Sequence, residues 1–149
     1  MSVEDRHPLV GLVDEVIRLH GRLATVHGDR GETEGLTGAQ ALVLTAVINA
    51  GRPPTVPQIG RSLGHARQSV QRIANALIAQ GLLTSTENPD HKRAPLLLPT
   101  EAGRAIHSRL HDRAQGWIAR VTEGIAPDDL AAATKTLRTL RERLEADLR

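Results

Sequence analysis

The sequence of 149 residues contains no cysteine, tyrosine or phenylalanine, and its only tryptophan is Trp117. The lack of cysteine excludes disulfide bonds and redox sensing through thiols. Because aromatic rings are nearly absent, the chain also lacks the stacking platforms with which many proteins bind single-stranded nucleic acid. The core must therefore consist of aliphatic side chains, which suits a fold built from helices.

Long apolar runs are absent as well, and none approaches the length of a membrane span. The first residues, Met1–Asp5, have no signal-peptide character. Hydrophobic residues make up 40% and charged residues 24% of the chain, which is typical of a soluble globular protein. We therefore expect one cytoplasmic domain spanning residues 1–149, without a membrane partner.

Signatures of catalysis are missing too. The sequence has no nucleophile with a base at a fixed spacing, no glycine-rich phosphate loop and no metal-hydrolase motif, which predicts a protein that is not an enzyme and needs no cofactor.

The positive charge of the chain is concentrated in one segment. Residues 61–93 carry five Lys and Arg against two acids, a net charge of +3, whereas the whole chain is only +2. This distribution favours a partner rich in phosphate, such as DNA.

A short helix is predicted directly before this basic segment. Thr55 to Gln58 form a capping box in which each side chain can satisfy a backbone N–H of the other, and Pro57 lies in the first turn, where no N–H is missed. Gly64 ends the helix as a residue that can adopt positive φ. The spacing then predicts a tight turn and a second helix.

The second helix begins at Arg67 and runs to Gln80. Its apolar positions recur every three or four residues and define a buried face, made of Val70, Ile73, Ala74 and Leu77. The other face is polar and consists of Arg67, Gln68, Ser69, Gln71, Arg72 and Asn75. Arg and Gln pair bidentately with guanine and adenine in the major groove, so these residues are predicted to bind DNA. The alternative is a helix face that is polar only because it is exposed to solvent. That alternative can account for any single residue, but it accounts less well for the whole set.

A β-hairpin is predicted to follow. Residues 82–86 are β-prone, residues 87–90 form a turn, the chain returns over 94–98, and Thr100 caps the next helix. The loop carries two more predicted DNA contacts, Lys92 and Arg93. The expected fold is mainly α with a small β-hairpin wing, a winged helix-turn-helix lobe over residues 30–103.

The two ends of the chain are predicted to form amphipathic helices. An apolar stripe marks the first, over residues 8–27, and residues 104–149 contain a long helix and a last helix opened by Pro127. The leucines of the last helix either pack within the chain or lie in an interface between two copies. We interpret both segments as dimerisation helices, because readers of twofold DNA sites are generally dimers.

Several segments together resemble the MarR family of transcription regulators. They are Leu36–Gly51, Gln80–Leu83, Asn88–Arg93 and Leu98–Gly103. The resemblance implies a homodimer that binds a palindromic operator in double-stranded DNA and acts as a ligand-responsive repressor. Two positions depart from the family pattern. His91 replaces an acid that usually precedes the wing arginine, so Arg93 should be held less rigidly, and Ala66 replaces the usual Ser or Thr cap of the second helix.

The resemblance also implies that a small lipophilic anion binds between the dimer helices and the DNA-binding lobe. The candidate lining residues for this effector are His20, His27 and Trp117, with Arg18 or Arg22. His20 lies on the apolar side of its helix, where a histidine buried in the core or an interface is the simpler interpretation.

Two alternatives stay open. His107 and His111 lie one helical turn apart and could share a zinc ion, as in a zinc-sensing MarR-like regulator, with His20, His27, Asp14 or Glu15 completing the site. Two solvated or interfacial histidines explain the same spacing. The second alternative is a protein that coats chromosomal DNA without sequence specificity.

Overall fold

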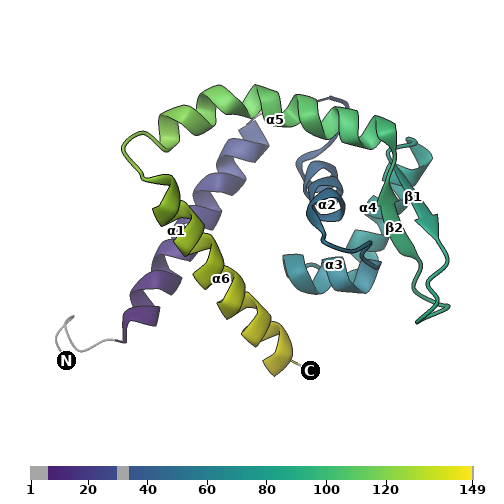
Figure 1. Cartoon of the computed structure of the whole chain (residues 1–149), viewed down its shortest axis with the longest axis horizontal. Coiled ribbons are helices and arrows are strands. Elements are labelled where there is room, and N and C mark those ends of the chain that lie inside the picture. The colour runs from purple at the N-terminus through teal and green to yellow at the C-terminus, as the bar shows by residue number, and fades with distance from the viewer. Residues whose placement is uncertain (1–6, 30–33, 149) are drawn as a thin grey trace. The chain divides into compact units, whose positions relative to one another are not determined.

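The computed structural model describes residues 7–29 and 34–148. These residues form α-helices α1 to α6 and a two-stranded antiparallel sheet (Figure 1), which confirms the predicted fold class. The elements are α1 (Pro8–Asp29), α2 (Gly38–Asn49), α3 (Val56–Leu63), α4 (Arg67–Ala79), β1 (Leu83–Thr86), β2 (Leu96–Pro99), α5 (Glu101–Val121) and α6 (Pro127–Asp147). The chain divides into two units with a boundary between Gly38 and Ala39, and each is described by itself.

The first unit contains α1, which extends two residues beyond the predicted end at residue 27. Large apolar side chains line the helix and remain exposed, among them Leu9, Val10, Val13, Ile17 and Leu19. On its polar side, Arg18 Nε donates to Asp14 Oδ2 at 2.8 Å. The helix therefore combines a solvated polar side with an apolar stripe that no described residue of its own unit covers.

The second unit contains an aliphatic core, as the scarcity of aromatic residues predicts. The buried side chains come from α2, α3, α4 and the hairpin, and they include Val43, Leu44, Val47, Ile59, Val70, Ala74, Leu77, Leu83 and Leu97. Burying a side chain of this size contributes roughly 1.5–3 kcal/mol relative to leaving it exposed. Three of the four residues predicted for the inner face of the second helix, Val70, Ala74 and Leu77, are fully buried, whereas Ile73 is half-buried.

The turn between α3 and α4 follows the sequence prediction closely. Thr55 Oγ1 accepts from the Gln58 backbone N–H at 3.4 Å, and Gln58 Oε1 accepts from the Thr55 N–H at 2.9 Å. Gly64 ends α3 with φ of 67°. A second glycine, Gly60, allows the turn after α3 to pack closely against the helix. A Cβ at this position would lie 2.9 Å from the His65 carbonyl oxygen. α4 begins after Ala66, which gives it no side-chain cap.

The base of the hairpin is tied to the helices on both sides. Thr100 Oγ1 accepts from the Gly103 N–H at 3.0 Å and donates to the Gly81 carbonyl at 2.6 Å, while the Thr100 N–H donates to the Leu82 carbonyl at 3.1 Å. Gly103 leaves no room for a side chain, since a Cβ there would lie 2.1 Å from the Leu82 oxygen. These contacts join the end of α4, the hairpin and the start of α5 at one point.

Both strands are slightly shorter than predicted. The Leu82 N–H donates to the Leu77 carbonyl at 2.9 Å, so Leu82 lies in the turn that closes α4 and β1 begins at Leu83. Ala94 is held in the loop, because its carbonyl accepts from Asn88 Nδ2 at 2.9 Å. β2 therefore begins only at Leu96, which pairs with Thr86.

The last two helices bury little. Only Gly103 of α5 is buried, and α6 has no buried residue. α6 does touch the lobe, where Arg141 Nη1 donates to Ser62 Oγ at 3.1 Å and also pairs with Glu145. No helix in the described part of the chain is long and apolar enough to cross a membrane.

Candidate nucleic-acid interface

The outer face of α4 is open to solvent. Arg67, Gln68, Gln71, Arg72 and Asn75 are exposed, and Ser69 is half-buried. The helix presents these side chains outward because its apolar positions are fixed in the core on the opposite side. α4 therefore carries a row of guanidinium and amide groups on a rigid support, which is the arrangement needed to contact the edges of bases.

The loop between β1 and β2 carries the exposed side chains of Lys92 and Arg93. Asn88 shapes this loop: its Oδ1 accepts from the Asp90 N–H at 3.1 Å, and its Nδ2 donates to the Ala94 carbonyl. His91 contributes through its backbone, accepting from the Ala94 N–H at 3.1 Å. Sequence reasoning missed the role of Asn88, although an Asn before Pro is typical of a side-chain-closed turn.

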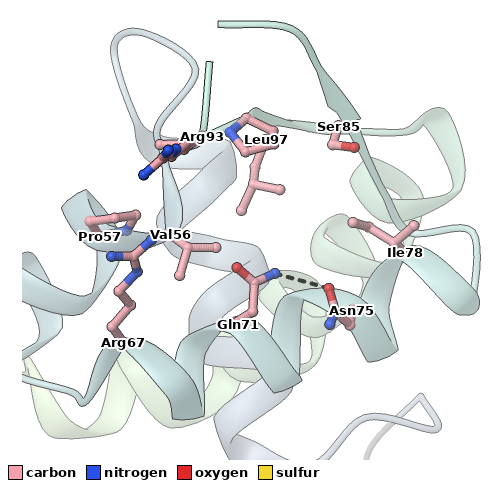
Figure 2. A pocket seen from close by; sticks show the side chains of 11 residues that line it. Val56, Pro57, Arg67, Gln71, Asn75, Ile78, Ser85, Arg93 and Leu97 are labelled. Carbon is pink, nitrogen blue, oxygen red and sulfur yellow. Dashed lines mark hydrogen bonds between the residues drawn. The ribbon is translucent and has the colours of Figure 1, made fainter. Parts of the chain in front are cut away.

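A hollow of about 190 Å³ lies between α4 and the hairpin, next to the start of α3. Its lining includes Arg67, Gln71 and Asn75 of α4 together with Arg93 of the hairpin loop. Figure 2 shows the guanidinium groups of Arg67 and Arg93 on the same side of the hollow. The structure thus brings four of the predicted DNA-binding residues around one space, whereas Gln68, Ser69, Arg72 and Lys92 do not line it.

One hydrogen bond links two of these side chains. Gln71 Nε2 donates to Asn75 Oδ1 at 2.9 Å, one helical turn further along α4 (Figure 2). Arg93 makes no ion pair with any residue in the described ranges, so its charge remains available to a partner.

The predicted effector residues lie in different units. His20 is exposed on α1, so it is not a core histidine of this chain, and Trp117 is half-buried on α5. The side chain of His27 lies outside the described residues. A joint site of these three residues therefore stays a prediction.

The zinc alternative gains no support from the geometry. His107 is half-buried and His111 is exposed, and a ring nitrogen of His111 pairs with the side-chain amide of Gln115. Among the described side chains, those of residues 7–26 and 34–148, no three His, Asp or Glu lie close enough together to hold a metal ion.

Comparisons with known proteins agree with this geometry. The model of the MarR family matches residues 34–94, which include α2, α3, α4, β1 and most of the loop that follows β1. The uncharacterized protein Rv2011c of Mycobacterium tuberculosis is 38% identical over 136 residues, covering 91% of this chain and 94% of that protein.

Solved structures are similar over nearly the whole chain. The MarR family transcription regulator SP03579 is 27% identical, with a TM-score of 0.63 and coverage of 95% of both chains. BpsR of Bordetella bronchiseptica, whose DNA binding is regulated by 6-hydroxynicotinic acid, is 22% identical, with a TM-score of 0.62 over 87% of this chain and 98% of its own. Members of the matched family are transcription regulators rather than enzymes. The exposed basic face of α4, the hairpin beside it and these matches together place the chain in the MarR family of transcription regulators.

Proposed function

We propose that this protein is a sequence-specific regulator that binds a palindromic operator in double-stranded DNA as a homodimer and represses transcription until an effector binds. The observation that carries the proposal is the hollow between α4 and the hairpin, where amide and guanidinium groups from both elements meet. A protein of this kind would act in the cytoplasm.

The two groups of side chains are assigned different tasks. Arg67, Gln68, Gln71 and Arg72 lie nearest the bases of the major groove, with Ser69 and Asn75 beside them. Lys92 and Arg93 reach the neighbouring backbone and minor groove. Supporting this division, α4 is fixed by its buried face, while the hairpin loop is closed by the side chain of Asn88.

The homodimer is inferred from apolar surface that the chain itself leaves uncovered. Leu130, Leu137 and Leu144 of α6 are 41%, 37% and 63% exposed, Leu148 directly after the helix is 88% exposed, and the stripe of α1 is exposed as well. Monomeric proteins rarely leave contiguous apolar patches of this kind open to water. A twofold dimer would place two copies of α4 about one helical turn of DNA apart, roughly 10 bp.

The effector is proposed to be a small lipophilic anion. The relative BpsR supports this class, because 6-hydroxynicotinic acid is a small aromatic acid. His20, His27 and Trp117 remain the candidate contacts, with Arg18 or Arg22. Arg18 already pairs with Asp14, so Arg22 is the better source of positive charge.

Selection of bound DNA from a random pool tests the proposal. We expect a palindrome with half-sites roughly 10 bp apart to be enriched. If random competitor DNA displaces the protein as readily as the selected site does, the protein is instead a coating protein without sequence specificity.

Single substitutions then separate reading from positioning. Arg72→Ala should cost on the order of 1–3 kcal/mol and relax preference at one position, whereas Lys92→Ala should weaken all sequences alike and lower the salt slope by about one unit. Arg93→Ala should cost less than Arg72→Ala, because the acid that usually precedes the wing arginine is replaced by His91. An Arg72→Ala protein that still discriminates fully between selected and scrambled sites would show that α4 is not the reader.

A further inference from the structure

Gln71 and Asn75 differ from the other polar residues of α4 in being paired with each other. The bond from Gln71 Nε2 to Asn75 Oδ1 is 2.9 Å long, and both side chains are exposed and line the hollow beside the hairpin. An exposed pair of this kind contributes little to helix stability. The hydrogen bond instead fixes the direction in which the side-chain amide of Gln71 points.

The bond also determines what Gln71 can still offer. A glutamine amide has one acceptor oxygen and two N–H donors, and Asn75 takes one of the donors. The oxygen accepts no hydrogen bond from any described residue. Gln71 is therefore left with one donor and one free acceptor, side by side at the end of the side chain.

One base matches that pair. The major-groove edge of adenine presents an acceptor, N7, next to a donor, the N6 amino group. Guanine presents two acceptors, N7 and O6, and needs two donors, of which Gln71 retains only one. Cytosine offers a donor alone, and thymine an acceptor beside a methyl group.

We infer that Gln71 reads an adenine in each half-site and that Asn75 is a positioning residue, which aims the Gln71 amide rather than reading a base itself. This assignment rests on the proposed function, in which α4 enters the major groove. On this assignment Gln71 contacts the base and Asn75 positions Gln71, whereas the sequence pattern alone treats the two residues as equivalent.

The test is selection from a random DNA pool with the full-length protein and its variants. We expect one position in each half-site to prefer adenine by roughly tenfold or more, and Gln71→Ala to remove that preference, which identifies the position. Asn75→Ala should lower the same preference by about threefold or more, because the amide is no longer aimed. Asn75→Asp keeps an acceptor for Gln71, so it should retain the adenine preference although its charge weakens binding to every sequence.

Gln68→Ala is the matched control, because Gln68 is an exposed glutamine of α4 outside the amide pair, and it should change preference at a different position. A guanine preference at the Gln71 position, or an adenine preference that Asn75→Ala leaves unchanged, would overturn the assignment while leaving the proposed function intact. A wild-type protein that enriches no sequence would overturn both.

Discussion

The lobe formed by α2, α3, α4 and the hairpin differs sharply from the terminal helices α1 and α6. The lobe has a continuous set of buried aliphatic residues, a capping box at α3 and a hydrogen-bonded junction at Thr100. α6 has no buried residue, and α1 leaves large apolar side chains exposed. The lobe is stabilised by contacts within the chain, whereas the terminal helices leave large apolar side chains exposed.

This difference bears on how the protein would work. A lobe held by its own core can carry the reading helix as a rigid body. Terminal helices that bury their apolar faces only on assembly can set the distance between two such lobes. The comparison predicts that substitutions in the lobe change folding, and that substitutions in α6 change assembly.

The largest effect is expected in the core. Leu77 is fully buried in α4, and Leu77→Ala should lower the free energy of unfolding by about 2–5 kcal/mol, because it removes methyl groups and leaves a cavity. Chemical denaturation followed by circular dichroism measures the change. The matched control is Leu42→Ala on α2, where the side chain is 43% exposed and a much smaller loss is expected. Equal losses at the two positions would contradict the picture of a packed lobe.

The junction beneath the hairpin should be the next most sensitive point. Gly103→Ala places a Cβ 2.1 Å from the Leu82 carbonyl oxygen, so the backbone must move, at a cost of about 1–3 kcal/mol or more. Gly116→Ala is the control on the same helix, since the nearest atom to its Cβ is a flexible Arg120 nitrogen at 3.8 Å. The control should stabilise the helix by roughly 0.5–1 kcal/mol. Thermal unfolding of both variants checks whether their effects have opposite signs.

In α6, a charge should break the dimer without unfolding the lobe. Leu144 is 63% exposed in the chain, and Leu144→Glu should weaken dimerisation by about 2 kcal/mol per protomer, close to the value of burying one leucine. Sedimentation over a range of concentrations measures the dissociation. Arg143→Gln, on the same helix, also lowers the charge by one and controls for a simple change of charge. A dimer that is unaffected by Leu144→Glu would place the interface elsewhere.

The smallest effect is a gain of stability. α4 begins at Ala66 without a side-chain cap, and Ala66→Ser should stabilise the lobe by about 0.5–1 kcal/mol. Ala126 also precedes a helix without a cap, so Ala126→Ser on α6 is a matched comparison. Because α6 has no buried residue, its cap should raise the melting temperature of the lobe less than the cap of α4. A larger gain from Ala126→Ser would show that α6 is part of the cooperative core.

The sequence by itself determined the local structure. The capping box at Thr55, the glycine at position 64, the buried face of α4 and the cap at Thr100 all follow from interactions within a few residues, which pattern reasoning captures well. The exposed face of α4 was predictable for the same reason, and the aliphatic core followed from the scarcity of aromatic residues.

Only the tertiary structure decided how side chains from separate elements meet. The hollow lined by Arg67, Gln71 and Arg93 depends on the packing of the hairpin against α4, and the loop closure by Asn88 depends on where Ala94 returns. The close approach of Gly103 to Leu82 likewise joins residues more than one element apart. No local sequence pattern specifies such contacts. The burial of apolar surface determines how the elements pack, and the polar groups that then become neighbours follow from that packing.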